Sequence, residues 1–550
     1  MAKQVSGEQM YVLPEGAQRV LGRDAMRINI AIGYAVANIV KTTLGPKGMD
    51  KMLVSDLGDI VITNDGATIL EEMNVDHPAA KLMVEIAKTQ DKEVGDGTTT
   101  SVVLGGNLLK AAGNLLDQGI HPTTIIKGFE IAENEAEKLL DKLSREVTPE
   151  DEETLEKIAL ISMSSKGIGS DDEKKKIAKM VVSAIKQVAE EENGKYVIDT
   201  ELVKIEKKAG GEVMDTELVN GVVVDKEIVH AGMPKRVKTA KVALVDAALE
   251  IDKTETDAKI NITSPDQMEA FLKQEEKMLK DMVEKIKKSG ATVIFCQKGI
   301  DDLAQHYLAK AGVAAVRRVK KSDMEKLARA TKAKIASSID DLSADDLGDA
   351  GLVEEKKVGG EAMVFVKECR EPKSVSIFVR GGTDHVVSEV ERAIRDTLGS
   401  VGSTVEYGKY TTGGGSVEMA ISAALQDFAL KVGGREQLAI QAFAEALESI
   451  PKALAENAGM DAIDTLVTMR NKHKGGKNSN FGVDVLNGKV DDIEKAGVLE
   501  PTKVKKQAIS SATETARLVL RIDDIISSKG GGGGGMPPGG PGMPPGMGME

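Results

Sequence analysis

The sequence predicts a multidomain protein of mixed α+β and α/β class, in which an α/β unit is inserted between helical segments. Residues 19–143, and the chain after residue 408, carry apolar residues at helical spacing. Five short apolar runs with strand character lie between them. Because 550 residues exceed what one hydrophobic core organises, three or four domains are expected.

Composition limits the classes of function. A net charge of -14 and a pI near 5.3 disfavour binding to nucleic acid or anionic membranes, which clustered Lys and Arg would provide. No signal core and no run of about 18 uncharged apolar residues is seen. Cys296 and Cys369 are the only cysteines, so a disulfide framework is excluded. We expect no nucleic-acid partner, no membrane span and a cytoplasmic location.

The first helical segment contains Gly95-Asp96-Gly97-Thr98-Thr99-Thr100, directly ahead of a run with helical periodicity. Thr98–Ser101 should therefore form the first turn of a helix, where unpaired N–H groups and the dipole attract anions. Glycines on both sides of Asp96 allow close backbone approach to a phosphate, and its carboxylate suits Mg²⁺. Taken alone, the hexapeptide fits a capped helix after a glycine turn better.

Other polar motifs are scattered along the chain. Residues 43–50 form a Gly-Pro turn after a helix, and residues 63–68 form a turn with Asp65 at its tip. Lys166 is an isolated base, a residue type usually found at the surface. Glycines 413–415 precede another helix, and Glu500 precedes the last one. No P-loop and no complete dinucleotide fingerprint occurs, which disfavours P-loop ATPases and Rossmann enzymes.

The inserted unit alternates strands and helices, as an α/β fold requires. Its predicted strands are Val222–Val224, Val242–Val245, Val293–Cys296, Ala314–Val316 and Ser376–Val379. Residues 264–267 read as a capping box with proline at the first helical position. The apolar stripe that follows fits either a helix packed on a core or an outward helix that grips apolar partners. The Gly-, Pro- and Met-rich tail is expected to be disordered.

The joint occurrence and order of these motifs resembles the chaperonin family, and within it the thermosome-type group II chaperonins of archaea. The resemblance runs nearly end to end, through residues 13–17, 43–51, 64–68, 95–99, 297–302, 380–383, 413–415 and 520–524. It implies an equatorial ATP-binding domain (1–148 and 406–526), an intermediate domain (149–218 and 371–405), an apical domain (219–370) with a lid protrusion at about 248–288, and a disordered tail (527–550).

The resemblance also assigns roles to individual residues. It implies ATP and Mg²⁺ as cofactors, with Asp96 on the metal and Asp65 and Asp396 flanking the γ-phosphate as catalytic carboxylates. Lys166 corresponds to an intermediate-domain lysine that senses the γ-phosphate, and Glu500 suits a ribose hydroxyl. The remaining implied nucleotide contacts are Thr43, Leu44, Gly45, Pro46, Gly66, Gly97, Thr98, Thr99, Thr100 and Gly414.

The implied function is an ATPase that encloses unfolded or partly folded polypeptides and promotes their folding. The implied assembly is a homo- or hetero-oligomer of two stacked eight- or nine-membered rings, with hydrolysis driving closure of a built-in lid. Two alternatives remain: a ring-forming scaffold or holdase with little turnover, and a metabolic ATP-using enzyme. The sequence departs from the family pattern on both sides of the glycine triplet. Relatives usually have aliphatic residues or proline at the positions of Thr411 and Thr412, and alanine at the position of Ser416. Nucleotide affinity or ATP turnover can therefore differ.

Overall fold

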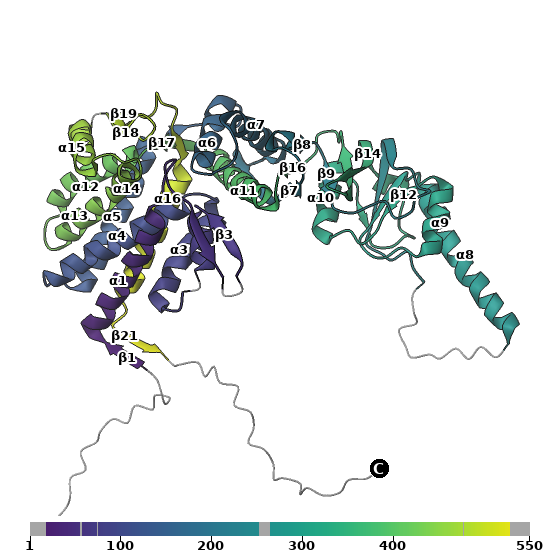
Figure 1. Cartoon of the computed structure of the whole chain (residues 1–550), viewed down its shortest axis with the longest axis horizontal. Helices are drawn as coiled ribbons and strands as arrows, with labels where there is room; N and C mark the ends of the chain where they lie inside the picture. The colour runs from purple at the N-terminus through teal and green to yellow at the C-terminus, as the bar shows by residue number, and fades with distance from the viewer. Residues whose placement is uncertain (1–17, 56–57, 74, 252–263, 477, 528–550) are drawn as a thin grey trace, which may run out of the picture.

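The computed structural model describes residues 18–55, 58–73, 75–251, 264–476 and 478–527. Three separate hydrophobic cores organise them, and each lies in its own part of the elongated molecule (Figure 1). We call these parts the helical body (residues 18–146 and 409–527), the middle body (147–219 and 375–407) and the distal body (222–367). The middle body lies between the other two.

The helical body joins helices from both ends of the chain around one core. Phe129 and Phe443 meet edge to face in this core, with ring centroids 5.8 Å apart. This packing joins segments more than 300 residues apart in sequence, since each is amphipathic and covers the other's apolar face. Its helices are α1 (Gly22–Lys41), α2 (Gly66–Glu72), α3 (Pro78–Val94), α4 (Thr98–Asp117), α5 (Pro122–Leu143), α12 (Ser416–Val432), α13 (Glu436–Leu447), α14 (Ser449–Asn457), α15 (Ala462–His473) and α16 (Thr502–Val519).

Small sheets edge the helical body. The first and last described strands, residues 18–21 and 524–527, pair as an antiparallel ribbon, and a three-stranded sheet lies beside the glycine triplet. The strands are β1 (Gln18–Leu21) with β21 (Asp524–Ser527), β2 (Lys51–Val54) with β3 (Ile60–Thr63), β18 (Phe481–Asp484) with β19 (Lys489–Asp492), and β20 (Leu499–Pro501), β17 (Lys409–Thr412) and β4 (Arg145–Glu146).

The middle body packs three helices on a three-stranded sheet with the order β7-β16-β8. Ser170 and Glu173 form a capping box that starts α7, as a helix N-terminus requires. Its elements are α6 (Glu152–Ser164), α7 (Asp171–Val188), α11 (Asp384–Tyr407), β5 (Glu190–Glu192), β6 (Lys195–Val197), β7 (Val203–Ala209), β8 (Glu217–Val219) and β16 (Val375–Gly381).

The distal body is an α/β unit whose sheet runs β12-β11-β10-β14-β15-β9. The β11 and β12 strands and the last four residues of β10, Val242–Val245, are parallel and buried as continuous apolar runs, as parallel strands covered by helices are. Its elements are β9 (Val222–Val224), β10 (Arg236–Val245), β11 (Val293–Cys296), β12 (Ala314–Val316), β13 (Ile335–Ala336), β14 (Gly348–Val358), β15 (Glu361–Lys367), α8 (Pro265–Ser289), α9 (Asp302–Ala311) and α10 (Lys321–Thr331).

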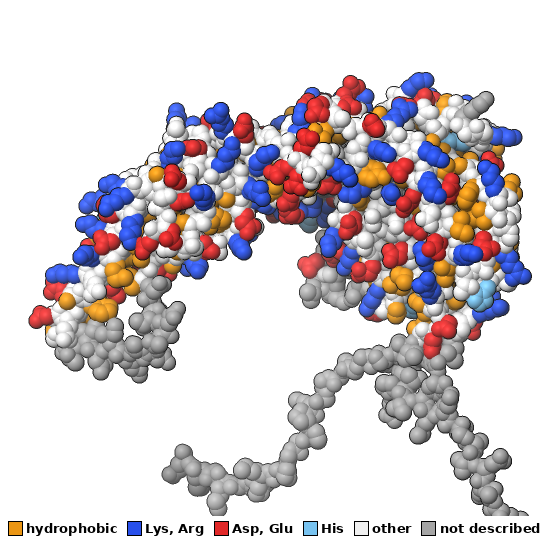
Figure 2. All heavy atoms as spheres, turned by 180° about the vertical axis from the view of Figure 1, so that it is seen from behind, with side chains coloured by type: hydrophobic (Ala, Val, Ile, Leu, Met, Phe, Trp, Pro, Cys, Tyr) orange, Lys and Arg blue, Asp and Glu red, His pale blue; other side chains and the backbone are white. Residues whose placement is uncertain are grey.

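The predicted lid segment, residues 248–288, lies partly outside the described residues, because 252–263 are not among them. The part that is described, α8, starts at the predicted cap, where Ser264 accepts a hydrogen bond from the N–H of Gln267. Its C-terminal half packs on the distal core, whereas its first half extends away from the sheet (Figure 1). Met268, Phe271 and Leu272 in that first half and Met278 at the middle of the helix are exposed. Figure 2 shows hydrophobic side chains near the end of the arm. The C-terminal half of the stripe therefore packs on a core and its first half is exposed, while contact of that half with apolar partners stays a prediction.

The helical spacing after residue 408 is interrupted once, and one strand prediction needs correction. The stretch from Leu438 to Asn457 is divided at Glu448 into α13 and α14, because Pro451 has no N–H to continue the helical ladder. The predicted strand at residues 376–379 is β16, which pairs with β7 and β8 in the middle body and not with the distal sheet. The predicted disordered tail lies almost wholly outside the described residues, which end at 527.

Candidate functional site

The glycine turn before α4 has the geometry of an anion site. Gly95 and Gly97 adopt left-handed conformations, with φ of 68° and 76°, which glycine reaches without steric cost. Gly97 is the N-cap of α4 and offers no side chain to cap it, so the first-turn N–H groups of a 20-residue helix stay uncapped by a side chain. The Gly97 N–H itself donates to Asp96 Oδ1 at 2.7 Å, which orients that carboxylate. The predicted helix start at Thr98 is confirmed.

A second helix start lies against the first. Asp65 is the N-cap of α2, where its Oδ2 accepts hydrogen bonds from the N–H and hydroxyl of Thr68. Its Oδ1 accepts a hydrogen bond from Thr98 Oγ1 at 3.0 Å, which joins the two turns. A Cβ at Gly66 would lie 2.7 Å from Thr99 Oγ1, so only glycine allows this approach. Residues 65–66 and 96–100 therefore form one polar cluster at two helix N-termini.

The middle body adds a buried ion pair to this cluster. Lys166 Nζ donates to Asp396 Oδ2, and the two residues are only 7% and 8% exposed. The surface position that sequence favoured for Lys166 is thus wrong, because Asp396 on α11 offsets the cost of burying its charge. Burial raises the pKa of Asp396 to about 7; Asp65 and Asp96 raise it as well, while Lys166 lowers it.

Contacts between the middle body and the helical body hold the middle body against the cluster. We call this contact region the joint. A Cβ at Gly399 on α11 would lie 2.8 Å from the Cα of Gly95, so the two backbones touch at a pair of glycines. Arg392, also on α11, donates from Nη1 to Thr63 Oγ1 at 3.1 Å. The amide of Asn64 donates to the carbonyl oxygen of Ser165. The loop carrying Lys166 and the helix carrying Asp396 are therefore both fixed next to Asp65 and Asp96.

The glycine triplet forms a third wall. Gly414 and Gly415 have φ of 60° and 71°, and a Cβ at Gly413 would lie 2.2 Å from Glu500 Oε1. Glu500 in β20 pairs with Thr411 in β17, and its carboxylate contacts Lys505 Nζ at 2.6 Å. Burial raises the pKa of Glu500, and the charge of Asp96 raises it further, so this wall lies close to the acidic cluster.

The predicted loop at residues 43–46 reaches the site from another side. It follows the end of α1, and Thr43 Oγ1 donates to the carbonyl oxygen of Val40. The amide of Asn457 donates to the carbonyl oxygen of Leu44 at 2.9 Å, and a Cβ at Gly45 would lie 2.4 Å from Leu454. Leu44 packs on an apolar cluster formed by Met419, Leu454, Ala455, Met469, Val483 and Val485.

This apolar cluster also lies under the glycine triplet. Val483 donates its N–H to the carbonyl oxygen of Gly414 at 2.8 Å. The loop at 43–46 therefore adjoins Gly414 across the apolar cluster, whereas no hydrogen bond or ion pair among the described residues joins it to Asp65, Asp96 or Asp396. The arrangement offers charged and hydroxyl groups on one side and an apolar wall on the other, which suits a phosphorylated ligand with an apolar ring.

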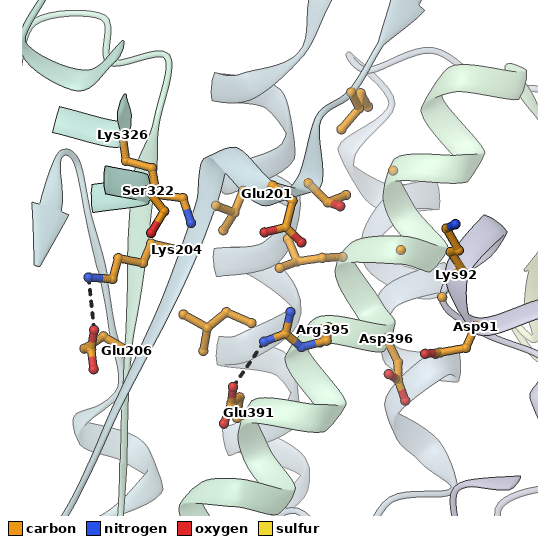
Figure 3. A pocket seen from close by; sticks show the side chains of 18 of the residues that line it. Asp91, Lys92, Glu201, Lys204, Glu206, Ser322, Lys326, Glu391, Arg395 and Asp396 are labelled. Atoms are coloured by element: carbon orange, nitrogen blue, oxygen red, sulfur yellow. Dashed lines mark hydrogen bonds and ion pairs between the residues drawn. The ribbon is translucent and has the colours of Figure 1, made fainter. Parts of the chain in front are cut away.

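A cavity of about 710 Å³ borders the carboxylates at the meeting point of the three bodies. Figure 3 shows Asp396 and Asp91 at one end, with Lys204 and Lys326 at the other. Of the glycine turn before α4 only Gly95 lines this cavity, so the cavity is not formed by Thr98–Thr100.

The site contains residues that sequence reasoning missed. Burial raises the pKa of Asp91, with Asp65 and Glu71 raising it further. Gln90 donates from Nε2 to the carbonyl oxygens of Asp96 and Val504, at 2.8 and 3.1 Å. Both residues lie in a regular helix with no local motif, so only the turn after Val94 could have drawn attention to them.

A divalent cation fits this donor set only together with a phosphorylated ligand. Among the described residues, no group of three or more His, Cys, Asp or Glu side chains is arranged to hold a metal ion by itself. Mg²⁺ prefers oxygen ligands and is usually held by one or two carboxylates plus phosphate oxygens. Asp96, beside an uncapped helix N-terminus, provides one such carboxylate.

Comparison with known proteins identifies the class. Residues 36–530 match the TCP-1/cpn60 chaperonin family, and the chain belongs to this family, whose members act in protein folding and use nucleotides. It is 59% identical over 526 residues to the thermosome subunit of Pyrococcus abyssi, covering 96% of this chain and 95% of that protein. It is 58% identical over 523 residues to the thermosome subunit of Methanopyrus kandleri, covering 95% of each.

A third relative extends the match. The thermosome subunit beta of Methanothermobacter thermautotrophicus is 56% identical over 540 residues, covering 98% of each chain. The resemblance read from the motifs is thereby confirmed, and with it the multidomain chaperonin fold and a function as a group II chaperonin. No helix among the described residues is long and apolar enough to cross a membrane.

Proposed function

We propose that this chaperonin subunit is an ATPase that uses ATP and Mg²⁺ to drive enclosure and folding of non-native polypeptides. The observation that carries the proposal is the buried Lys166–Asp396 pair. It comes from the middle body and lies beside Asp65 and Asp96 of the helical body. Phosphoryl transfer to water needs positioning and charge neutralisation more than covalent chemistry. The cluster supplies both.

Each residue has a distinct part in this proposal. Asp96 holds Mg²⁺, which when bound neutralises charge on the phosphate oxygens, and the N–H and hydroxyl groups of Thr98–Thr100 bind the phosphates. Asp396 and Asp65 orient the attacking water, and Asp396 accepts its proton. Lys166 sets the charge of Asp396 and faces the γ-phosphate. Gly45 and Pro46 line the nucleotide beside Thr43 and Leu44.

The joint between bodies supports a coupling of hydrolysis to motion. Lys166 and Asp396 belong to the middle body, so ATP makes contacts in the closed arrangement that an open one lacks. We propose that the three bodies are the equatorial (1–148 and 406–526), intermediate (149–218 and 371–405) and apical (219–370) domains. Closure of the intermediate domain then moves the apical domain and its α8 protrusion as a lid.

We propose two stacked rings of eight or nine subunits and clients with exposed apolar segments. The exposed apolar side chains on the first half of α8 support client binding, because adaptable Met and Phe side chains fit varied partners. The same names in the relatives, "thermosome subunit", support a ring assembly. Cys296 and Cys369 are buried free thiols, which suits a reducing cytoplasm.

Substitution of Asp396 tests the ATPase assignment. Asp396→Ala should bind ATP with unchanged stoichiometry but lose hydrolysis by roughly 10²-fold or more, since it removes a positioned proton acceptor. Release of refolded client should stop with it. Asp384→Ala, an exposed acid at the start of the same helix, is the matched control and should hydrolyse ATP normally. Unchanged hydrolysis in Asp396→Ala would refute the role assigned to this carboxylate.

A further inference from the structure

A buried triad of charges lies behind the glycine triplet. Lys505 Nζ contacts Glu500 Oε2 and Glu418 Oε1, each at 2.6 Å. The side chains of Lys505 and Glu418 are each 7% exposed, whereas that of Glu500 is 31% exposed. One lysine is thus shared by an inner carboxylate, which solvent does not reach, and an outer carboxylate that faces the site.

Three elements fix the positions of the triad. Glu418 lies in the first turn of α12, directly after Gly415, and Lys505 lies in the first turns of α16. The backbone of Glu500 is held by pairing of β20 with β17. Its carboxylate stands over Gly413, where a Cβ would lie 2.2 Å from Oε1. The outer carboxylate, Glu500, therefore lies beside the glycine triplet on a strand that is paired with β17.

The charges explain why a lysine is needed here. Burial raises the pKa of Glu500, with Glu418 raising it further, while Lys505 lowers it. An ionised carboxylate accepts hydrogen bonds on both oxygens, whereas a protonated one uses one oxygen as a donor. Glu418 Oε2 is buried with no hydrogen-bond partner among the described residues. Glu418 thus contacts Lys505 through Oε1 alone, and this buried contact helps to keep the lysine in the interior.

We infer that Lys505 is a positioning residue: it fixes the Glu500 carboxylate as an acceptor for the two ribose hydroxyls, so the site selects ribonucleotides over deoxyribonucleotides. The inference rests on the nucleotide site proposed above. Glu500 is the residue that touches the sugar, and Lys505 acts through it. Glu418 holds Lys505 from the opposite side, at the start of the helix that follows the glycine triplet.

Equilibrium binding of ADP, 2′-deoxy-ADP and 3′-deoxy-ADP in the presence of Mg²⁺ tests this inference on the full-length chain. The wild type should bind ADP about tenfold more tightly than either deoxynucleotide, as expected for a hydrogen bond to a charged acceptor. Lys505→Met should reduce that preference to about twofold or less, by weakening ADP and leaving the deoxynucleotides nearly unchanged. A merely structural role would weaken all three ligands alike.

Matched variants make the result decisive. Lys506→Met removes the next lysine of α16, which is partly buried, pairs with Glu137 at 3.3 Å, and does not contact Glu500. This variant should keep the wild-type preference. If Lys505→Met does not assemble, the double substitution Glu418→Gln with Lys505→Gln keeps the net charge of the triad and should also lose the preference. A tenfold preference for ADP over the deoxynucleotides that persists in either Lys505 variant overturns the inference. A wild type that binds ADP and both deoxynucleotides equally well also overturns it. A wild type that binds no ADP instead refutes the proposed nucleotide site.

Discussion

The pH dependence of hydrolysis should reveal the Lys166–Asp396 pair. In the wild type the pKa of Asp396 is raised to about 7, and we propose that its ionised form accepts the proton of the attacking water. The value of kcat/KM for ATP should therefore rise with pH through about 7, because kcat/KM reports groups of the free enzyme. Below this value the carboxyl is protonated and hydrolysis falls.

Lys166→Met should move that limb to higher pH. The lysine lowers the pKa of Asp396 by its charge and its hydrogen bond, so its removal raises that pKa further. A hydrogen bond to a charged group contributes about 1.5–3 kcal/mol, and one pKa unit corresponds to about 1.36 kcal/mol. The limb should accordingly move up by about one to two pH units. Maximal activity should also fall, because the proposed role of Lys166 is to face the γ-phosphate.

Initial rates at low ATP, measured between about pH 5.5 and 9.5, provide the assay. Lys157→Met is the control, since Lys157 lies in α6, is 42% exposed and pairs with Glu153 on the same helix. Its profile should match the wild type. A Lys166→Met limb that stays near the wild-type position would refute the account, because the pair would then not set the charge of Asp396.

The remaining predictions concern the joint, the metal and the client surface. Gly399→Ala places a Cβ 2.8 Å from the Cα of Gly95, so ATP hydrolysis should fall about tenfold or more while binding persists. Gly402→Ala, whose Cβ meets its nearest atom at 3.4 Å, should retain most activity, and an equal loss in both would argue against a special joint. Asp96→Asn should raise the Mg²⁺ concentration for half-maximal hydrolysis by about tenfold in a metal titration, and an unchanged requirement would remove Asp96 from the metal site. The Phe271 side chain is 38% exposed on α8, so Phe271→Ser should weaken capture of unfolded polypeptide without changing basal hydrolysis. The control Lys273→Ser, on the same helix, should capture unfolded polypeptide normally. Normal capture by Phe271→Ser would exclude α8 from client binding.

Sequence patterns were sufficient for locally encoded features. The start of α4 at Thr98 and the cap of α8 at Ser264 follow from residues within one turn of each helix, and both are confirmed. The predicted strands at 222–224, 293–296 and 314–316 match the structure residue for residue. A short, continuous apolar run between turn signals is typical of a buried strand.

Features that depend on distant partners could not be obtained in this way. Lys166 reads as a surface base because the residue that pairs with it, Asp396, is 230 positions away. Glu418 and Lys505 carry no local signal, since their pairing results from the meeting of α12 and α16. The site at Gly95–Thr100 gained meaning only from the joint order of remote motifs, because each turn alone is a common loop.

Electron microscopy of the purified chain, with and without ATP, tests the central claim most directly. The account predicts double rings of eight or nine subunits in both samples, open without nucleotide and closed over the cavity with ATP and Mg²⁺. Monomers or small oligomers in both samples would contradict the ring assembly. Rings with the same shape in both samples would contradict the coupling of the Lys166–Asp396 joint to closure.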